Sequence, residues 1–156
     1  MNSRRIIALS GSLRAASTNA ALLREIAAGA PDGISVEIFP LGGLPLFNPD
    51  YEQFLPASVT RFRAEVGQAD AMIIASPEYA HGVSGVLKNA LDWLVGSDGF
   101  AGKPVLILNA APRARHAIAA LREILATMSA QIVDELPEID TAIHLYSQGY
   151  SNAVHS

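Results

Sequence analysis

Cysteine is absent from the 156-residue sequence. A chain without cysteine has no disulfide, thiolate metal site, iron–sulfur cluster or cysteine nucleophile, and this composition fits a cytoplasmic protein. Clusters of positive charge are also absent, since 11 lysines and arginines stand against 15 acidic residues and the net charge is −4. We therefore expect no broad nucleic-acid surface, although small phosphorylated ligands are compatible with this charge.

Long apolar runs are missing as well. The run that follows the N-terminal cations spans only residues 6–9, which is too short for the apolar core of a signal peptide. No run approaches the ~20 residues of a membrane span, so we expect neither export nor a membrane partner. Repeats and linkers are absent, and 50% of the residues are hydrophobic. We expect one domain over residues 1–156, with an atypical tail at about 136–156.

Two common phosphate-binding signatures are absent too. The dinucleotide pattern GxGxxG does not occur, because Gly11 stands alone after the first apolar run. The lysine-bearing P-loop does not occur either, since no Gly-Lys-Ser/Thr is found in the chain. A nucleotide would therefore have to be bound by a different pattern.

Short apolar runs are present at intervals along the chain. Residues 6–9, 71–75 and 105–108 are continuously apolar, which is typical of strands covered on both faces. Residues 34–39 alternate between apolar and polar side chains, as in an outer strand. Residues 131–133 are a weaker candidate for a fifth strand.

Helical periodicity appears between these runs. One helical face gathers Leu22, Leu23, Ile26, Ala27 and Ala30, and a later one gathers Ile118, Leu121, Leu125 and Met128. Further helices are expected at about 56–69 and at 86–94. The alternation βαβαβαβαβ predicts an α/β fold, a parallel sheet with right-handed crossovers and helices on both faces. Both doubly wound strand orders remain open on this pattern.

Ligands of such sheets bind at the carboxyl ends of the strands. The relevant loops are residues 10–18, 76–84 and 110–115, and all three are rich in Gly, Ser, Pro, Arg or His. The first carries the stretch GSLRAASTN at residues 11–19, just before a helix. A helix N-terminus attracts anions, and this loop adds hydroxyl, amide and guanidinium donors from Ser12, Arg14, Ser17, Thr18 and Asn19. The alternative is that Ser17 or Thr18 only caps the helix while Arg14 is solvated.

The second loop opens the stretch SPEYAHGVSGVLKNALDW at residues 76–93. Together with GSLRAASTN, it resembles the NADPH-dependent FMN reductase family, whose fold is flavodoxin-like and which includes quinone, azo-dye and chromate reductases. The family patterns are GSxRxxSxN and PEYN-x3-PGxLKNALDW. Both occur here in the family's order and spacing, and the resemblance extends from Arg4 to Val133.

The resemblance implies a five-stranded sheet of order 2-1-3-4-5, FMN as cofactor, NADPH as co-substrate and a homodimer or homotetramer. It places the FMN phosphate on Ser12, Arg14, Ser17 and Asn19, and the flavin ring on Pro77, Glu78 and Tyr79. We expect the rest of the cofactor site to include Gly11, Thr18, Ala80, His81, Gly82 and Ala111. The flavin carries the redox chemistry, so no catalytic side chain and no metal site are expected.

The chain departs from the family pattern at two positions of the second loop. Ala80 replaces the asparagine and Ser84 replaces the later proline, so contact at position 80 must come from backbone or from His81. Structural alternatives remain open for this loop. Tyr79 is then a surface aromatic, Glu78 a hydrogen-bonding or interface residue and His81 a plain loop residue. Residues 88–93 are expected to pack, inside the subunit or against a partner.

The third loop places Arg113 and Arg115 next to the small residues Ala110 and Ala111. A guanidinium suits the 2′-phosphate of NADPH, so both arginines are predicted to bind that co-substrate. The alternative is that they are surface cations at a helix start, where cations are disfavoured. Beyond Glu135 the chain leaves the family pattern. The short segment 138–156 either packs irregularly, leaves a sheet face to a neighbouring subunit, or marks a shortened version of the fold.

The leading hypothesis is an FMN-dependent NAD(P)H oxidoreductase. It would pass hydride from NADPH to the flavin, and then electrons to a quinone, an azo compound, a metal oxyanion or free flavin. One alternative is a flavodoxin-like electron carrier without pyridine-nucleotide activity. Arg14 and the modest charge of −4 count against it, because such carriers are usually strongly acidic and bind phosphate without arginine. Another alternative is a flavin-free binding protein.

Overall fold

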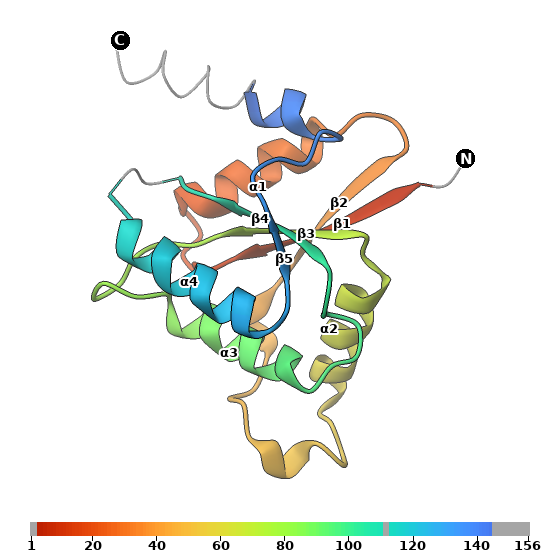
Figure 1. Ribbon diagram of the computed structural model, residues 1–156, viewed down its shortest axis with the longest axis vertical. Coiled ribbons are helices and arrows are strands. Elements are labelled where there is room, and N and C mark those ends of the chain that lie inside the picture. Colours follow the sequence, from red (N-terminus) through yellow and green to blue (C-terminus); the bar gives the residue numbers. More distant parts are fainter. Residues whose placement is uncertain (1–2, 111–112, 145–156) are drawn as a thin grey trace.

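The computed structural model describes residues 3–110 and 113–144. Within that part of the chain, one parallel sheet has the strand order β2-β1-β3-β4-β5 (Figure 1). Its strands are β1 Arg4–Ser10, β2 Ile34–Phe39, β3 Ala71–Ala75, β4 Pro104–Leu108 and β5 Gln131–Val133. The sheet confirms the flavodoxin-like fold. Each strand was predicted, and β1 is longer because polar residues extend the apolar run at both ends.

The helices lie on both faces of this sheet. They are α1 Thr18–Ala28, α2 Ala57–Gln68, α3 Gly85–Val95 and α4 Arg115–Thr127, with short 3₁₀ turns at Leu41–Gly43 and Pro49–Tyr51. Helix α1 covers one face, and α2, α3 and α4 cover the other (Figure 1). None of the helices in the described ranges has the length and apolar character needed to cross a membrane.

The core has two halves, one on each face of the sheet. Leu23 and Ile26 of α1 pack on one face, and Phe62 of α2 and Leu91 of α3 belong to the other half. The central strand β3 is buried throughout, which explains its uninterrupted apolar sequence. Strand β2 lies at the sheet edge, as its alternating sequence predicted. Its apolar residue Ile38 is nevertheless 37% exposed.

The described part of the C-terminal segment packs on the α1 face. Leu136 and Ile139 are buried in the same cluster as α1, and residues 140–144 are helical. Arg4 forms an ion pair with Glu138 at 2.5 Å, which fixes the segment to the start of β1. The sequence left the covering of this face open, and residues 136–144 supply part of it.

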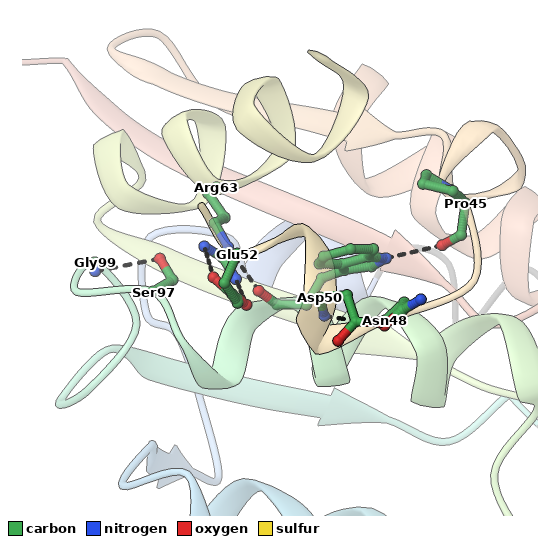
Figure 2. A network of polar contacts seen from close by, with 8 residues as sticks. Pro45, Asn48, Asp50, Glu52, Arg63, Ser97 and Gly99 are labelled. Atoms are coloured by element: carbon green, nitrogen blue, oxygen red, sulfur yellow. Dashed lines mark hydrogen bonds and ion pairs between the residues drawn. The ribbon is translucent and has the colours of Figure 1, made fainter. Parts of the chain in front are cut away.

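The loop after β2 is bound to α3 by the buried side chain of Trp93 and the half-buried side chain of Asn89. The Pro45 carbonyl accepts hydrogen bonds from Asn89 Nδ2 at 2.9 Å and from Trp93 Nε1 at 2.8 Å. Arg63 of α2 donates to the Trp93 carbonyl at 2.7 Å and pairs with Glu52 of the loop at 2.7 Å (Figure 2). The packing role predicted for this part of α3 is confirmed inside the subunit for Asn89 and Trp93.

Candidate functional site

The first loop ends in a capped helix. Ser17 is the N-cap of α1, and its buried Oγ accepts a hydrogen bond from the Ala20 backbone N–H at 3.3 Å. Thr18 follows as the first helical residue and is exposed. The capping alternative is therefore confirmed for Ser17. It does not exclude a ligand role, because the accepting oxygen keeps its own hydrogen for donation.

Asn19, the second residue of α1, has a polar atom left unsatisfied by the described residues. Its side chain is 5% exposed, and Oδ1 has no hydrogen-bond partner within the part of the chain that the structure describes. A buried polar atom without a partner costs free energy unless a ligand or water satisfies it. Because Oδ1 is an acceptor, a ligand hydroxyl or a water that donates to it would remove this cost, whereas a phosphate oxygen would not. The residues therefore fit a cofactor that brings a phosphate to the N–H groups of α1 and a hydroxyl donor to Asn19.

Ser12 and Arg14 lie in the exposed part of the same loop. Ser12 Oγ accepts from the Arg14 backbone N–H at 3.3 Å, which closes a short turn between the two residues. The Arg14 side chain is exposed and forms no ion pair within the described ranges. It is therefore available for an anion.

Gly11 joins the first loop to the second. Its N–H donates to the Ala75 carbonyl at 2.8 Å, which continues the pairing of β1 with β3. A Cβ at this position would lie 2.6 Å from Ser76 Oγ and 3.1 Å from Pro77 Cδ. A side chain at position 11 would therefore require Ser76 and Pro77 to shift, so glycine favours the close approach of the two loops.

The second loop forms a tight turn at its tip. Tyr79 and Gly82 exchange backbone hydrogen bonds of 3.1 and 2.9 Å. The central residues Ala80 and His81 have φ values of +49° and +60°, the pattern of a type I′ turn. Asparagine adopts positive φ far more readily than alanine. The positive φ at position 80 thus explains the asparagine of the family pattern. Ala80 adopts the same φ with backbone strain.

Tyr79 is 56% exposed. Its predicted role, like those of Pro77, Ala80 and Gly82, stays a prediction. Ser84 has a structural role that the sequence analysis missed. Its buried Oγ caps α3 by accepting from the Leu87 backbone N–H at 3.4 Å. A serine before a periodic apolar run was the available signal.

Glu78 links the second loop to the third. Its Oε2 accepts from the backbone N–H groups of His116 at 2.9 Å and Ala117 at 3.0 Å. It thereby caps α4, whose own N-cap residue Ala114 makes no side-chain bond. The hydrogen bond from Ala117 lowers the pKa of Glu78, partly opposed by desolvation and aided by the bond from His116. The structural alternative for Glu78 is confirmed, and flavin contact stays a prediction.

The third loop presents cations and an imidazole. Arg113 and Arg115 are both exposed, and neither forms an ion pair with another described residue. The His116 ring stacks on the His81 ring with centroids 4.3 Å apart and planes 19° apart. No pattern in the sequence indicates this pair. Ala111, predicted to line the cofactor site, lies outside the described residues.

The three loops share one edge of the sheet because β1, β3 and β4 are neighbours and parallel. Gly11 contacts the second loop, and Glu78 and His81 contact the start of α4. The arrangement offers an anion site at α1 and a surface of loop backbone beside it. This is what a phosphorylated ligand with a flat ring requires.

Curated relatives match about two thirds of this chain. An NAD(P)H-dependent FMN reductase of Pseudomonas aeruginosa is 43% identical over 109 residues, which are 68% of this chain and 59% of the relative. A quinone reductase of Escherichia coli is 39% identical over 107 residues, which are 65% of this chain and 57% of that protein. The chain thus spans less than two thirds of the length of these relatives.

Solved structures show the same architecture. The flavoenzyme FerB, an NAD(P)H:(acceptor) oxidoreductase from Paracoccus denitrificans, superposes with a TM-score of 0.77 at 28% identity. The match covers 84% of this chain and 75% of FerB. The sequence profile described as NADPH-dependent FMN reductase matches residues 4–142. The chain therefore belongs to the NADPH-dependent FMN reductase family.

Proposed function

We propose that this chain is an FMN-dependent NAD(P)H oxidoreductase that passes electrons to small acceptors, quinones first among them. The single observation that carries the proposal is the buried, unpartnered Asn19 Oδ1, an acceptor for a cofactor hydroxyl, at the Ser17-capped start of α1. The names of the relatives, an FMN reductase and a quinone reductase, support the same reaction class. Azo compounds, metal oxyanions and free flavin are further candidate acceptors.

The protein's part is to bind and orient its ligands, because bound FMN supplies the two-electron chemistry. The first loop would hold the phosphate with the Ser12 and Ser17 hydroxyls, the free N–H groups of α1 and the Arg14 guanidinium. The second loop would hold the ring with backbone groups near Gly82. No side chain needs to exchange a proton with a dyad partner in this scheme.

Nucleotide preference would depend on the third loop. The carboxylate of Glu78 already occupies the N–H groups of His116 and Ala117, so these two groups are not free for a 2′-phosphate. Recognition of that phosphate then falls on Arg113 and Arg115. We expect NADPH to be favoured over NADH by roughly ten- to a hundredfold.

The function is tested on the purified protein with its bound cofactor. A flavin absorbance band and oxidation of NADPH with a quinone are expected, whereas an electron carrier would show the band alone. A protein without flavin after reconstitution with FMN would refute the proposal. The double variant Arg113→Ala/Arg115→Ala should lose most of the NADPH preference in kcat/KM. If the ratio for the two nucleotides stays unchanged, these arginines do not read the 2′-phosphate.

A further inference from the structure

Three potential metal ligands converge beside the predicted flavin site. Glu78 and His81 come from the loop after β3, and His116 comes from the first turn of α4. One ligand atom from each residue lies within 4.8 Å of the other two. The sequence alone predicts no metal site, because 38 residues separate Glu78 from His116.

The chemistry of the three groups is selective. Two imidazoles and one carboxylate suit Zn²⁺ and its late first-row neighbours, whereas Mg²⁺ and Ca²⁺ require oxygen ligands. The ligand set carries one negative charge against two on the cation, and both imidazoles bind in their neutral form. We therefore expect a cluster of two imidazoles and one carboxylate to bind a transition metal more tightly than a surface cluster of carboxylates alone.

The backbone holds each ligand in place before any metal arrives. Both hydrogen bonds that α4 donates to Glu78 go to Oε2, so the cap does not need Oε1. The same bonds fix the backbone of His116 beside the carboxylate. His81 is held by the turn that Tyr79 and Gly82 close with two backbone hydrogen bonds. The entropic cost of metal binding is therefore limited to the lost rotation of the three ligand side chains.

Metal binding would change one feature of the present arrangement. A tetrahedral site with bonds of about 2.0–2.1 Å places its ligand atoms about 3.3 Å apart. A metal also lies in the plane of each imidazole it binds, so the parallel stack of His81 and His116 has to open. Both rings are exposed and have room to turn. Three protein ligands leave a fourth position for water or for an oxygen of an incoming molecule.

We propose that Glu78, His81 and His116 form a binding site for a late first-row transition-metal dication, with Zn²⁺ as its representative. The site adds positive charge at the meeting point of the second and third loops. Its ligands are distinct from the first-loop groups assigned to the FMN phosphate. Glu78 and His81 belong to the second loop, where the flavin ring is expected, so Zn²⁺ binding is measured together with the flavin content.

The test uses the full chain in its flavin-loaded form, purified without a polyhistidine tag and dialysed against a chelator. Calorimetric titration with ZnCl₂ should show one saturable site per chain, and MgCl₂ should show none. His81→Asn keeps a residue that tolerates positive φ, and His116→Gln keeps the backbone donor to Glu78. Each variant should weaken Zn²⁺ binding by at least roughly tenfold, and the double variant should abolish it.

Two further variants complete the design. Glu78→Gln keeps an oxygen that can cap α4 but removes the charge, so it should weaken Zn²⁺ binding while the protein stays folded. His144→Gln, in the segment packed on the α1 face, should leave the affinity unchanged. The proposal is overturned if the wild type shows no saturable Zn²⁺ site or if the double variant binds Zn²⁺ like the wild type. Flavin absorbance is recorded in parallel. A missing flavin band contradicts the proposed function, whereas a missing Zn²⁺ site contradicts only the metal proposal.

Discussion

At the scale of the residue, Arg14 is the only cation among residues 11–19 and has no competing ion pair within the described ranges. A guanidinium that meets a phosphate makes charge-assisted hydrogen bonds. We expect Arg14→Ala to weaken FMN binding by roughly 1.5–3 kcal/mol, measured by fluorescence titration of the apoprotein.

Arg24→Ala is the matched control, because Arg24 is an exposed arginine on the outer side of α1. It should bind FMN like the wild type. Equal affinities of the wild type and Arg14→Ala would show that Arg14 is merely solvated.

Ala80 gives a second prediction at this scale, about stability rather than binding. A non-glycine residue at φ +49° is strained, and asparagine tolerates that region better than alanine. Ala80→Asn should therefore raise the stability by about 0.5–1 kcal/mol, a rise in Tm of about 1–4 °C in a chain of this size. Thermal unfolding of Ala101→Asn, at an exposed turn residue without positive φ, serves as the reference. A lower Tm for Ala80→Asn would contradict the turn assignment.

At the scale of the element, helices and strands follow from local pattern, whereas their connections do not. The periodicity of α3 and α4 and the apolar run of β3 are local, so these elements were predicted within a few residues. The cap that Glu78 provides for α4 joins residues 38 positions apart and depends on the finished sheet. The stacking of His81 on His116 has the same origin. Sequence therefore predicted which loops form the site, but not how their side chains contact one another.

The anchoring of the loop after β2 gives a pH prediction. The hydrogen bond from Arg63 lowers the pKa of Glu52 below its ordinary value of 4.5, although desolvation opposes this shift. A lowered pKa in the folded state means that the pair stabilises the fold above the unfolded-state pKa. This stability is lost as the pH falls through the folded-state pKa.

Glu52→Gln should accordingly reduce the unfolding free energy at pH 7 by at most about 1 kcal/mol, since the pair is partly exposed. Urea unfolding should show the difference from the wild type shrinking below pH 4.5. Glu123→Gln, on the exposed side of α4, should show no such trend. A deficit that is the same at pH 7 and at acid pH would mean that the Arg63–Glu52 charge pair is not its cause.

At the scale of the whole molecule, α3 and α4 leave a partly apolar groove on the face away from the sheet. Its lining includes Val95, Ile124 and Met128, with Lys88 and Asp92 paired at 2.6 Å beside them. Val95, the last residue of α3, is 68% exposed. A second copy of the chain would bury these groups against their own counterparts, as a two-fold dimer requires.

We therefore expect the flavin-loaded protein to sediment as a homodimer at micromolar concentration. Val95→Glu places a charge in the contact and should weaken self-association at least about tenfold, equivalent to about 1.4 kcal/mol. Ile38→Thr, at the exposed edge strand β2, should leave the mass unchanged. Flavin content should be the same in both variants, because neither residue belongs to the three loops of the candidate site. A monomeric mass for the flavin-loaded wild type would rule the dimer out, and a dimeric mass for Val95→Glu would move the contact to another face.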